Sequence, residues 1–349
     1  MELDLFNGAS LDLDRIPLYR GKGYRLFKTL LSNACRMDCK YCPFSRVCRF
    51  PRDRWEKKEL VDRFLRSYRD RRVNGFFLSS SLYGDPERVV EDEIEVIDVL
   101  RRRGYRGYIH LRLMPGTPKD LLFQAVVLSD RAGLNIEAPR DVFREIAPSK
   151  GDWLNDIVKR IEWLVSLKKK FKRWGMEEPG YLSRGIDTQF VLGAGDETDR
   201  EVLETAWYLL EIGVDRIYVS GFKPYKGIVL ENRRPAPRWR TRRVIQAIEL
   251  MRVYKYRLDD ILLLLDNNDM LPDRDPKVAY AELNPNMFPV DLNNDPLEAI
   301  IKVPGIGPKS ARKIIELRNQ GTKITAKHLK EILGYKRFLK AYKYIIVTS

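Results

Sequence analysis

Six short apolar runs alternate with amphipathic stretches over residues 25–220, and this alternation constrains the fold more than any other feature. The runs are expected strands. The stretches between them, whose apolar residues recur at three and four positions, are expected helices. A helix between successive strands returns the chain to the same edge of a sheet, so the strands run parallel. A closed eightfold barrel would need two more units. The sequence therefore predicts an α/β fold built as a partial (β/α)6 TIM-like barrel.

The expected strands are Arg25–Leu31, Gly75–Ser80, Tyr108–Leu113, Leu134–Ala138, Thr188–Gly193 and Arg216–Ser220, and the expected helices are about Arg54–Arg72, Pro86–Arg103, Lys119–Ala132, Asp152–Trp174 and Glu197–Ile212. Beyond them, residues 222–240 are rich in Pro, Gly and Arg, which indicates a surface connection. Two helical stretches follow, at about Arg242–Tyr256 and Asp259–Leu265. We therefore expect four segments: an N-terminal extension at 1–24, the barrel at 25–222, a basic linker with helices at 223–290, and a helical domain at 291–349.

Charge points to the kind of partner. Lys and Arg total 64 against 49 acidic residues, which gives a net charge of +15. A surface rich in ion pairs, as in thermophiles, would explain the 32% of charged residues but not the positive excess. The excess favours association with polyanions such as nucleic acids. The longest apolar run, residues 261–265, is too short to span a membrane, and the acidic N-terminus lacks the layout of a secretory signal. A cytoplasmic protein is expected.

The four cysteines lie within fourteen consecutive positions, at Cys35, Cys39, Cys42 and Cys48. Such packing is typical of metal or cluster ligands in a reducing compartment, not of a disulfide scaffold. The first three form C-x3-C-x2-C directly after the first expected strand. Three thiolates can hold three irons of a [4Fe–4S] cluster and leave the fourth iron open. A four-thiolate zinc site that includes Cys48 is the alternative, and otherwise Cys48 is a buried free cysteine.

The cysteine loop resembles that of the radical S-adenosylmethionine superfamily, in which C-x3-C-x-φ-C follows the first strand of a partial barrel. Tyr41 occupies the aromatic position before Cys42. The resemblance implies that Cys35, Cys39 and Cys42 bind a [4Fe–4S] cluster whose fourth iron binds S-adenosylmethionine. It also implies that one electron from the cluster cleaves S-adenosylmethionine to methionine and a 5′-deoxyadenosyl radical, which takes a hydrogen atom from the substrate.

Further barrel segments resemble the superfamily's cofactor contacts, at the carboxyl ends of strands where barrels place their sites. Residues 75–81 end the second strand, where the superfamily usually has Gly-Gly-Glu; serines stand here instead. Residues 189–195 are similar to the fifth-strand Gly-x-Ile-x-Gly region against the adenine. The implied contacts to S-adenosylmethionine are Tyr41, Ser79, Ser80, Asn135, Glu137, Gln189, Val191, Gly193, Tyr218 and Ser220.

Residues 303–311 form a second motif, VPGIGPKSA, which resembles the hairpin of helix–hairpin–helix DNA-binding modules. Gly305 and Gly307 would allow a tight turn, with Ile306 as a plug between the helices. The free amides at the start of the following helix would bind a phosphate. From residue 295 onward, twelve Lys or Arg face four acidic residues, which favours a nucleic-acid contact over a simple turn. The expected contacts are Gly305, Ile306, Gly307, Lys309, Ser310, Arg312 and Lys313.

A second basic stretch at residues 233–243 contains no acidic residue and includes Trp239, whose ring could stack on a base. Arg238, Trp239 and Arg240 are therefore further candidate contacts to a nucleic acid.

Together the two motifs resemble the family described as DNA modification/repair radical S-adenosylmethionine proteins, over nearly the whole chain. The resemblance implies an enzyme that acts on a nucleic acid, DNA ahead of RNA, with an electron donor such as a ferredoxin or flavodoxin and a uracil-DNA-glycosylase-like partner. Two alternatives stay open. One is radical modification of transfer RNA. The other is a non-catalytic iron–sulfur protein that binds nucleic acid or senses redox state.

Overall fold

The computed structural model describes residues 18–21, 23–176 and 179–347, which divide into two compact units. Unit 1 comprises the described residues up to 197 together with 208–236, and unit 2 comprises residues 198–207 and 237–347. Within the described residues, no helix combines the length and the apolar character needed to cross a membrane.

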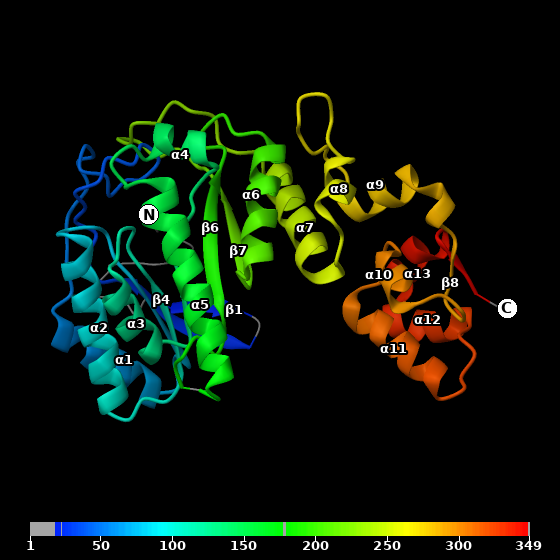
Figure 1. Cartoon of the computed structure of the whole chain (residues 1–349), viewed down its shortest axis with the longest axis horizontal. Coiled ribbons are helices and arrows are strands. Elements are labelled where there is room, and N and C mark those ends of the chain that lie inside the picture. Colours follow the sequence, from blue (N-terminus) through cyan, green and yellow to red (C-terminus); the bar gives the residue numbers. More distant parts are fainter. Residues whose placement is uncertain (1–17, 22, 177–178, 348–349) are drawn as a thin grey trace. The chain divides into compact units, whose positions relative to one another are not determined.

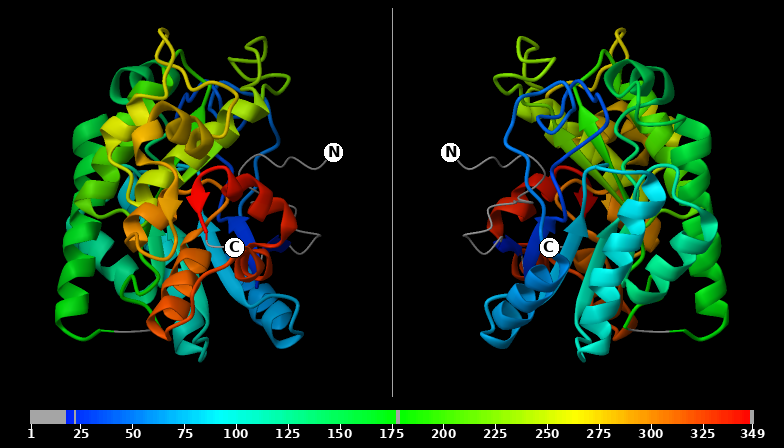
Figure 2. Two further views of the ribbon diagram at one scale, coloured as in Figure 1. Left: turned by 90° about the vertical axis from the view of Figure 1, so that its right-hand side faces the viewer. Right: turned by 90° about the vertical axis from the view of Figure 1, so that its left-hand side faces the viewer.

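Unit 1 is built on one curled sheet, with helices on its outer face (Figures 1 and 2). The strands are β1 (Leu18–Gly21), β2 (Tyr24–Leu30), β3 (Gly75–Ser79), β4 (Tyr108–Arg112), β5 (Arg131–Gly133), β6 (Ile186–Leu192) and β7 (Arg216–Gly221). Strands β2 to β7 run parallel in chain order, and β1 pairs antiparallel with β2 at the edge. The predicted six-stranded partial barrel is confirmed, with β1 as an unexpected seventh strand.

The connecting helices of the barrel are α1 (Lys57–Arg69), α2 (Pro86–Arg102), α3 (Lys119–Leu128), α4 (Arg140–Ile146), the π-helix η1 (Trp153–Val158), α5 (Lys159–Arg173) and α6 (Asp199–Ile212). They pack through apolar faces, as the aromatic cluster beneath α1 illustrates. Phe64 on α1 contacts Phe27 of β2 and Phe76 of β3, with ring centroids 5.8 and 4.7 Å apart, and all three side chains are fully buried. Burying three such rings stabilises the fold by several kcal/mol, at about 2–3 kcal/mol each.

The fourth parallel strand differs from its prediction. A strand was expected at Leu134–Ala138, whereas β5 covers Arg131–Gly133. A Cβ at Gly133 would lie 1.8 Å from the carbonyl oxygen of Asp187, so the backbones of β5 and β6 approach too closely there for any other residue. The apolar run that follows is buried, but Glu137 adopts a φ of +62° and makes only an isolated bridge to Phe190. The left-handed backbone at Glu137 therefore prevents residues 134–138 from pairing with β6 as a regular strand.

Several expected helix boundaries also shift, and the helices at Arg140–Ile146 and Pro276–Leu283 were not predicted. The helix expected at Asp152–Trp174 begins as the π-helix η1 before continuing as α5, and α4 was not expected at all. The surface connection expected through residue 240 ends earlier, because α7 already starts at Arg238.

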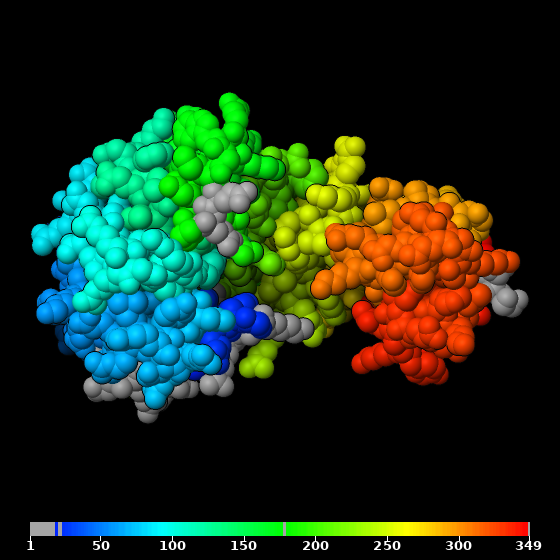
Figure 3. Space-filling view, turned by 90° about the horizontal axis from the view of Figure 1, so that it is seen from below, coloured from blue at the N-terminus to red at the C-terminus, as the bar shows by residue number. Residues whose placement is uncertain are grey.

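Unit 2 consists mainly of short helices and includes the described C-terminal residues (Figures 1 and 3). Besides the start of α6, its elements are α7 (Arg238–Tyr254), α8 (Leu258–Leu262), α9 (Pro276–Leu283), the 3-10 helix η2 (Pro285–Met287), β8 (Val290–Asp291), α10 (Leu297–Lys302), α11 (Pro308–Asn319), α12 (Ala326–Leu333), α13 (Tyr335–Tyr342) and β9 (Ile345–Ile346). β8 pairs with β9 and brings the two ends of the terminal segment together. A core of its own, centred on Ile300, Ile306, Ile314 and Leu329, stabilises this segment.

Candidate functional site

The loop that carries the cysteines is fixed to the barrel by hydrogen bonds on both sides of the motif. At its start, the N–H of Leu31 donates to the carbonyl oxygen of Ser79 at the end of β3 (2.7 Å). At its far end, the guanidinium of Arg52 donates to three carbonyl oxygens of the loop. These belong to Asn33 (3.1 Å), Ser45 (2.7 Å) and Cys48 (2.8 Å). One side chain therefore ties the two ends of the loop together.

The middle of the loop is attached to the segment after α4. The N–H of Asp38 donates to Ser149 Oγ (2.9 Å), and Ser149 returns hydrogen bonds to the Asp38 carboxylate through its N–H (3.0 Å) and hydroxyl (2.6 Å). The N–H of Lys40 donates to the carbonyl oxygen of Ile146 (2.8 Å). The thiol of Cys39 thus lies in a stretch of backbone that is bonded on either side of it.

Cys35, Cys39 and Cys42 lie close enough together for each thiol to influence the ionisation of its neighbours. Burial raises the pKa of the Cys39 thiol to about 12 and also raises the pKa of Cys42. Among the described residues, no three Cys, His, Asp or Glu side chains converge on a point as ligands of one ion do.

Cys48 does not complete a four-thiolate set. Its thiol donates to the carbonyl oxygen of Cys42 (3.6 Å), so its proton is directed at the backbone, and the side chain is buried. The donor set that remains is three thiols from one loop. This set fits a cluster with one iron left for another ligand.

A buried ion pair lies beside the thiols. Lys150 pairs with Oε1 of Glu137, and its Nζ lies 3.5 Å from the hydroxyl of Tyr41. Burial lowers the pKa of Lys150, but Glu137 and Cys39 outweigh this effect and hold it above its ordinary value. The other carboxylate oxygen of Glu137 is buried and has no hydrogen-bond partner in the part of the chain that the structure describes. A donor from a bound ligand would satisfy it.

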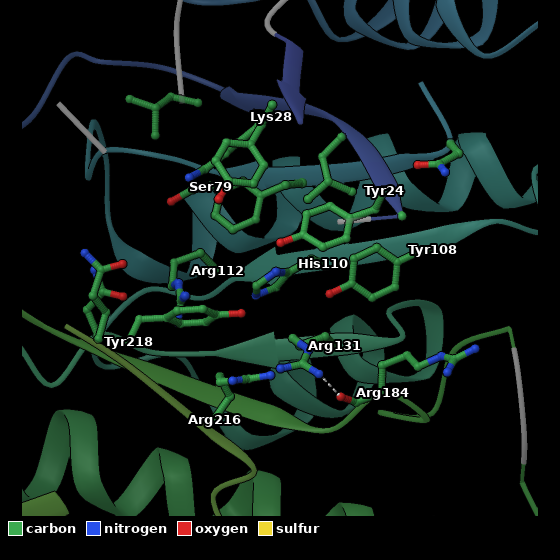
Figure 4. A pocket seen from close by; sticks show the side chains of 18 of the residues that line it. Tyr24, Lys28, Ser79, Tyr108, His110, Arg112, Arg131, Arg184, Arg216 and Tyr218 are labelled. Carbon is green, nitrogen blue, oxygen red and sulfur yellow. Dashed lines mark hydrogen bonds between the residues drawn. The ribbon is translucent and has the colours of Figure 1, made fainter. Parts of the chain in front are cut away.

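A cavity of about 700 Å³ occupies the inside of the half-barrel (Figure 4). Alternate residues of β2 line it, from Tyr24 at the start of the strand to Leu30 at its end, because side chains alternate between the two faces of a strand. We call this cavity the lumen. It reaches the carboxyl ends of the strands, where the cysteine loop begins.

Four of the ten predicted contacts to S-adenosylmethionine line the lumen: Ser79, Asn135, Gln189 and Tyr218. Gln189 Nε2 also donates to Ser220 Oγ (3.3 Å), and the Oδ1 of Asn135 is buried without a hydrogen-bond partner. Two more, Tyr41 and Glu137, meet at Lys150 beneath the cysteines. Ser80 does not line the lumen, and its hydroxyl donates to the carbonyl oxygen of Ser81 (2.9 Å).

Val191 and Gly193 contribute through the backbone. The N–H of Val191 donates to the carbonyl oxygen of Glu137 (2.7 Å). Gly193 adopts a φ of +86°, and a Cβ there would lie 2.9 Å from that of Ala236. Its carbonyl oxygen accepts from Arg233 Nε (2.9 Å). The glycine is thus required by the turn after β6, whatever binds beside it.

The sequence offered no signal for Lys150 or Arg52, although both side chains contact the cysteine region. Lys150 stands in a loop and Arg52 lies ten residues beyond the last motif cysteine. Their roles depend on distant partners, so only the folded chain reveals them.

In unit 2, the motif at residues 303–307 links α10 to α11, and Gly305 has a φ of +89°. Ile306 is buried between the helices, and its carbonyl oxygen accepts from Lys277 Nζ (2.5 Å). Gly307 is the N-cap of α11. We call residues 303–309 the hairpin.

Of the other predicted nucleic-acid contacts, Lys309, Arg312 and Lys313 are exposed around the first turns of α11, whereas Ser310 is buried. At the start of α7, Arg238 is exposed and Trp239 is half-buried. Arg240 is buried, and its Nε donates to Asp199 Oδ1 (2.9 Å), so its guanidinium stabilises the start of α6 and not a surface contact.

No family model matches the chain, and no curated protein matches it either. Solved structures do. The FeFe-hydrogenase maturase HydG from Carboxydothermus hydrogenoformans is similar over 64% of this chain and 50% of its own length, at 20% identity and a TM-score of 0.50. Another HydG structure aligns over 90% of this chain and 79% of its own length (14% identity, TM-score 0.48), and methylornithine synthase PylB over 63% and 60% (16%, 0.46).

The chain therefore spans half the length of the HydG from C. hydrogenoformans that it matches. At this identity the similarity establishes the fold alone, which is a partial α/β barrel shared with that HydG. The cysteine loop stands at the carboxyl end of the first parallel strand of that barrel.

Proposed function

We propose that the protein is a radical S-adenosylmethionine enzyme that acts on a nucleic acid, most readily in DNA modification or repair. The first half of this proposal, radical S-adenosylmethionine chemistry, is supported by the three-thiol loop at the carboxyl end of β2 in a partial barrel. When bound, the reduced cluster supplies the electron that cleaves S-adenosylmethionine. A small redox protein such as a ferredoxin or flavodoxin is the electron donor, and a uracil-DNA-glycosylase-like protein is a further partner.

The residues around the loop have definable tasks. Cys35, Cys39 and Cys42 hold the cluster, and the hydrogen bonds of Arg52 and Ser149 keep the loop in position. The Oε2 atom of Glu137, which is buried without a hydrogen-bond partner among the described residues, accepts a hydrogen bond from the bound cofactor. Lys150 places a positive charge beside the thiolates and reduces their mutual repulsion.

Anaerobic reconstitution of the full chain with iron and sulfide tests the first half. After reduction with dithionite, methionine and 5′-deoxyadenosine should appear in equal amounts from S-adenosylmethionine. If protein that holds a full cluster does not cleave S-adenosylmethionine, the enzyme assignment is wrong. The alternative, a non-catalytic iron–sulfur protein that binds nucleic acid or senses redox state, would then hold.

The hairpin supports the nucleic-acid half. Lys309, Arg312 and Lys313 are exposed near the N-terminus of α11, where the backbone amides attract an anion. Contacts of this kind bind the sugar–phosphate backbone and carry little sequence information. The base that reacts must then be flipped out or single-stranded to reach the barrel.

Replacing Lys309, Arg312 and Lys313 together by Ala should weaken nucleic-acid binding and reduce the salt slope of log K by about 2–3, since each phosphate contact contributes about 0.9. The matched control removes the same charge from Lys169, Lys170 and Lys172, exposed near the end of α5, where they interact with the helix dipole. Equal salt slopes for the two triple variants would show that the hairpin does not contact the phosphates of the nucleic acid. Titration of duplex DNA and transfer RNA side by side distinguishes the two substrates.

A further inference from the structure

The lumen has an uneven charge. Among the described residues that line it, five are Lys or Arg and none is Asp or Glu: Lys28, Arg112, Arg131, Arg184 and Arg216. A cavity wall of one sign in a low-dielectric interior concentrates the field and attracts ligands of the opposite sign. The lumen is therefore built for an anion.

One internal carboxylate offsets part of this charge. Asp187 on β6 is fully buried and accepts hydrogen bonds from Arg112 Nη2 (3.0 Å) and His110 Nε2 (3.2 Å). Burial raises the pKa of Asp187, but Arg112 and His110 outweigh it and hold the carboxyl ionised. Burial lowers the pKa of His110, although Asp187 acts to raise it. Asp215 pairs with Lys168 and, like Asp187, also acts on the Arg131 guanidinium.

Arg131 provides an independent sign of a missing ligand. It is the first residue of β5, and its Nη2 donates to the carbonyl oxygen of Arg184. Its Nε is buried and has no hydrogen-bond partner among the described residues. A buried donor without an acceptor costs about 1–3 kcal/mol, and an anion in the lumen would satisfy it.

Three tyrosines from the first halves of β2, β4 and β7 also line the lumen. Figure 4 shows the hydroxyls of Tyr24, Tyr108 and Tyr218 pointing toward the middle of the cavity, with Arg131 and Arg216 on one side and Ser79 on the other. Burial and Asp187 raise the pKa of Tyr218, whereas Arg131, Arg216 and Arg112 act to lower it, which places all three guanidinium groups near its hydroxyl.

The two ends of the lumen correspond to the two ends of the strands. Tyr108, Arg131 and Arg216 are the first residues of β4, β5 and β7, whereas Ser79 is the last residue of β3. From Tyr24 to Leu30, β2 extends about 20 Å at 3.3 Å per residue. The lumen is thus much longer than a phosphate ion and leaves room for a ring beyond the anionic group.

We infer that the lumen binds a nucleotide, with its phosphate at Arg131 and Arg216 and its ring among the tyrosines. The inference rests on the proposed function, which puts the reacting cofactor at the opposite, carboxyl end. Guanidinium groups match the geometry of phosphate oxygens, and tyrosine faces stack on any base. The phosphate end is thereby anchored away from the cluster, and the sugar and base extend toward Ser79, Asn135 and Gln189.

Binding to the reconstituted full chain tests this assignment. The probes are the four 2′-deoxynucleoside 5′-monophosphates and the matching nucleosides, measured by calorimetry. The monophosphates should bind at least about tenfold tighter, because guanidinium groups form charged hydrogen bonds with phosphate. Arg131→Gln and Arg216→Gln should each reduce this preference about tenfold and leave nucleoside affinity little changed. Arg106→Gln, in an exposed connection outside the lumen, is the charge-matched control and should bind like the wild type.

Equal affinity for nucleotide and nucleoside in the wild type would overturn the inference, as would an unchanged preference in both lumen variants when their melting is normal. A 5′-phosphorylated trinucleotide distinguishes the sources: tighter binding than the monophosphate indicates a nucleotide within a strand, and weaker binding a free nucleotide. Cleavage of S-adenosylmethionine by the wild type is scored separately. Wild type that cleaves S-adenosylmethionine without preferring nucleotides defeats this inference alone, whereas nucleotide binding without cleavage defeats the proposed function.

Discussion

The cysteine loop and the hairpin use the same device in different surroundings. In each, one basic side chain from outside the motif donates to backbone carbonyl oxygens within it. Arg52 is exposed and reaches three carbonyls of the cysteine loop. Lys277 is 8% exposed and reaches one carbonyl, that of Ile306. The exposed guanidinium of Arg52 remains hydrated by solvent. Burial of the Lys277 ammonium, in contrast, carries a desolvation penalty.

The two motifs also present different groups. Under the proposed function, the cysteine loop presents three thiols to a cofactor and therefore depends on the identity of three residues. The hairpin would present backbone amides to a phosphate and therefore depends on conformation. This difference predicts which substitutions each motif tolerates, and the variants below test it in order of expected effect.

Cys39→Ala should abolish cluster binding and reduce cleavage of S-adenosylmethionine to background, because the remaining two thiolates cannot hold the cubane. Cys48→Ala, the matched control, should keep both, since the Cys48 thiol only donates to the carbonyl of Cys42. Iron and sulfide content with the visible spectrum is the measurement. Cluster loss in Cys48→Ala with retention in Cys39→Ala would reverse the assignment of ligands.

Gly305→Ala should destabilise the hairpin by about 2–4 kcal/mol, because its φ of +89° disfavours a side chain and the Cβ would lie 2.6 Å from the carbonyl oxygen of Arg337. Gly307→Ala should be nearly neutral. Gly307 has a φ of −101°, and its Cβ would meet only the Tyr254 hydroxyl at 3.6 Å. Thermal unfolding of both variants is the check, and similar melting would show that conformation does not distinguish the two glycines.

Both motifs were predictable from sequence because each is contiguous: the cysteines fall within eight residues and the hairpin glycines within three. Arg52 and Lys277 were not, because each contacts a motif through tertiary folding, and Lys277 lies 29 residues before its acceptor. The lumen was equally hidden, since its cationic residues come singly from β2, β4, β5, β7 and the segment before β6. β5 was predicted too late in the chain because the run at 134–138 looked like the strand. The close approach of the backbones at Gly133 is visible only in the folded structure.

Arg52→Met should loosen the cysteine loop by about 1–3 kcal/mol, since it leaves three carbonyl oxygens to water. The expected result is faster loss of iron to a chelator, with little change in global melting. Arg46→Met is the control, because Arg46 is exposed and pairs only with the Asp38 carboxylate in the described structure (3.3 Å). If both variants lose iron at the wild-type rate, the loop does not depend on Arg52.

Lys277 should make the stability of the hairpin depend on pH. Burial lowers the pKa of Lys277 to about 7; Asp275 opposes this shift and Lys340 adds to it. Between pH 7 and about 10.5 the unfolded chain then binds one proton more than the folded chain. The free energy of unfolding therefore rises with pH in this window, by at most about 1.4 kcal/mol per unit.

Lys277→Met should flatten this rise, and Lys336→Met, at an exposed position of α13, should not. Hydrogen exchange of the α10 and α11 amides between pH 7 and 9, corrected for intrinsic rates, measures the local stability directly. A wild-type slope that survives in Lys277→Met would assign the pH dependence to another group. A slope lost only in Lys277→Met assigns it to the buried ammonium that donates to the carbonyl oxygen of Ile306.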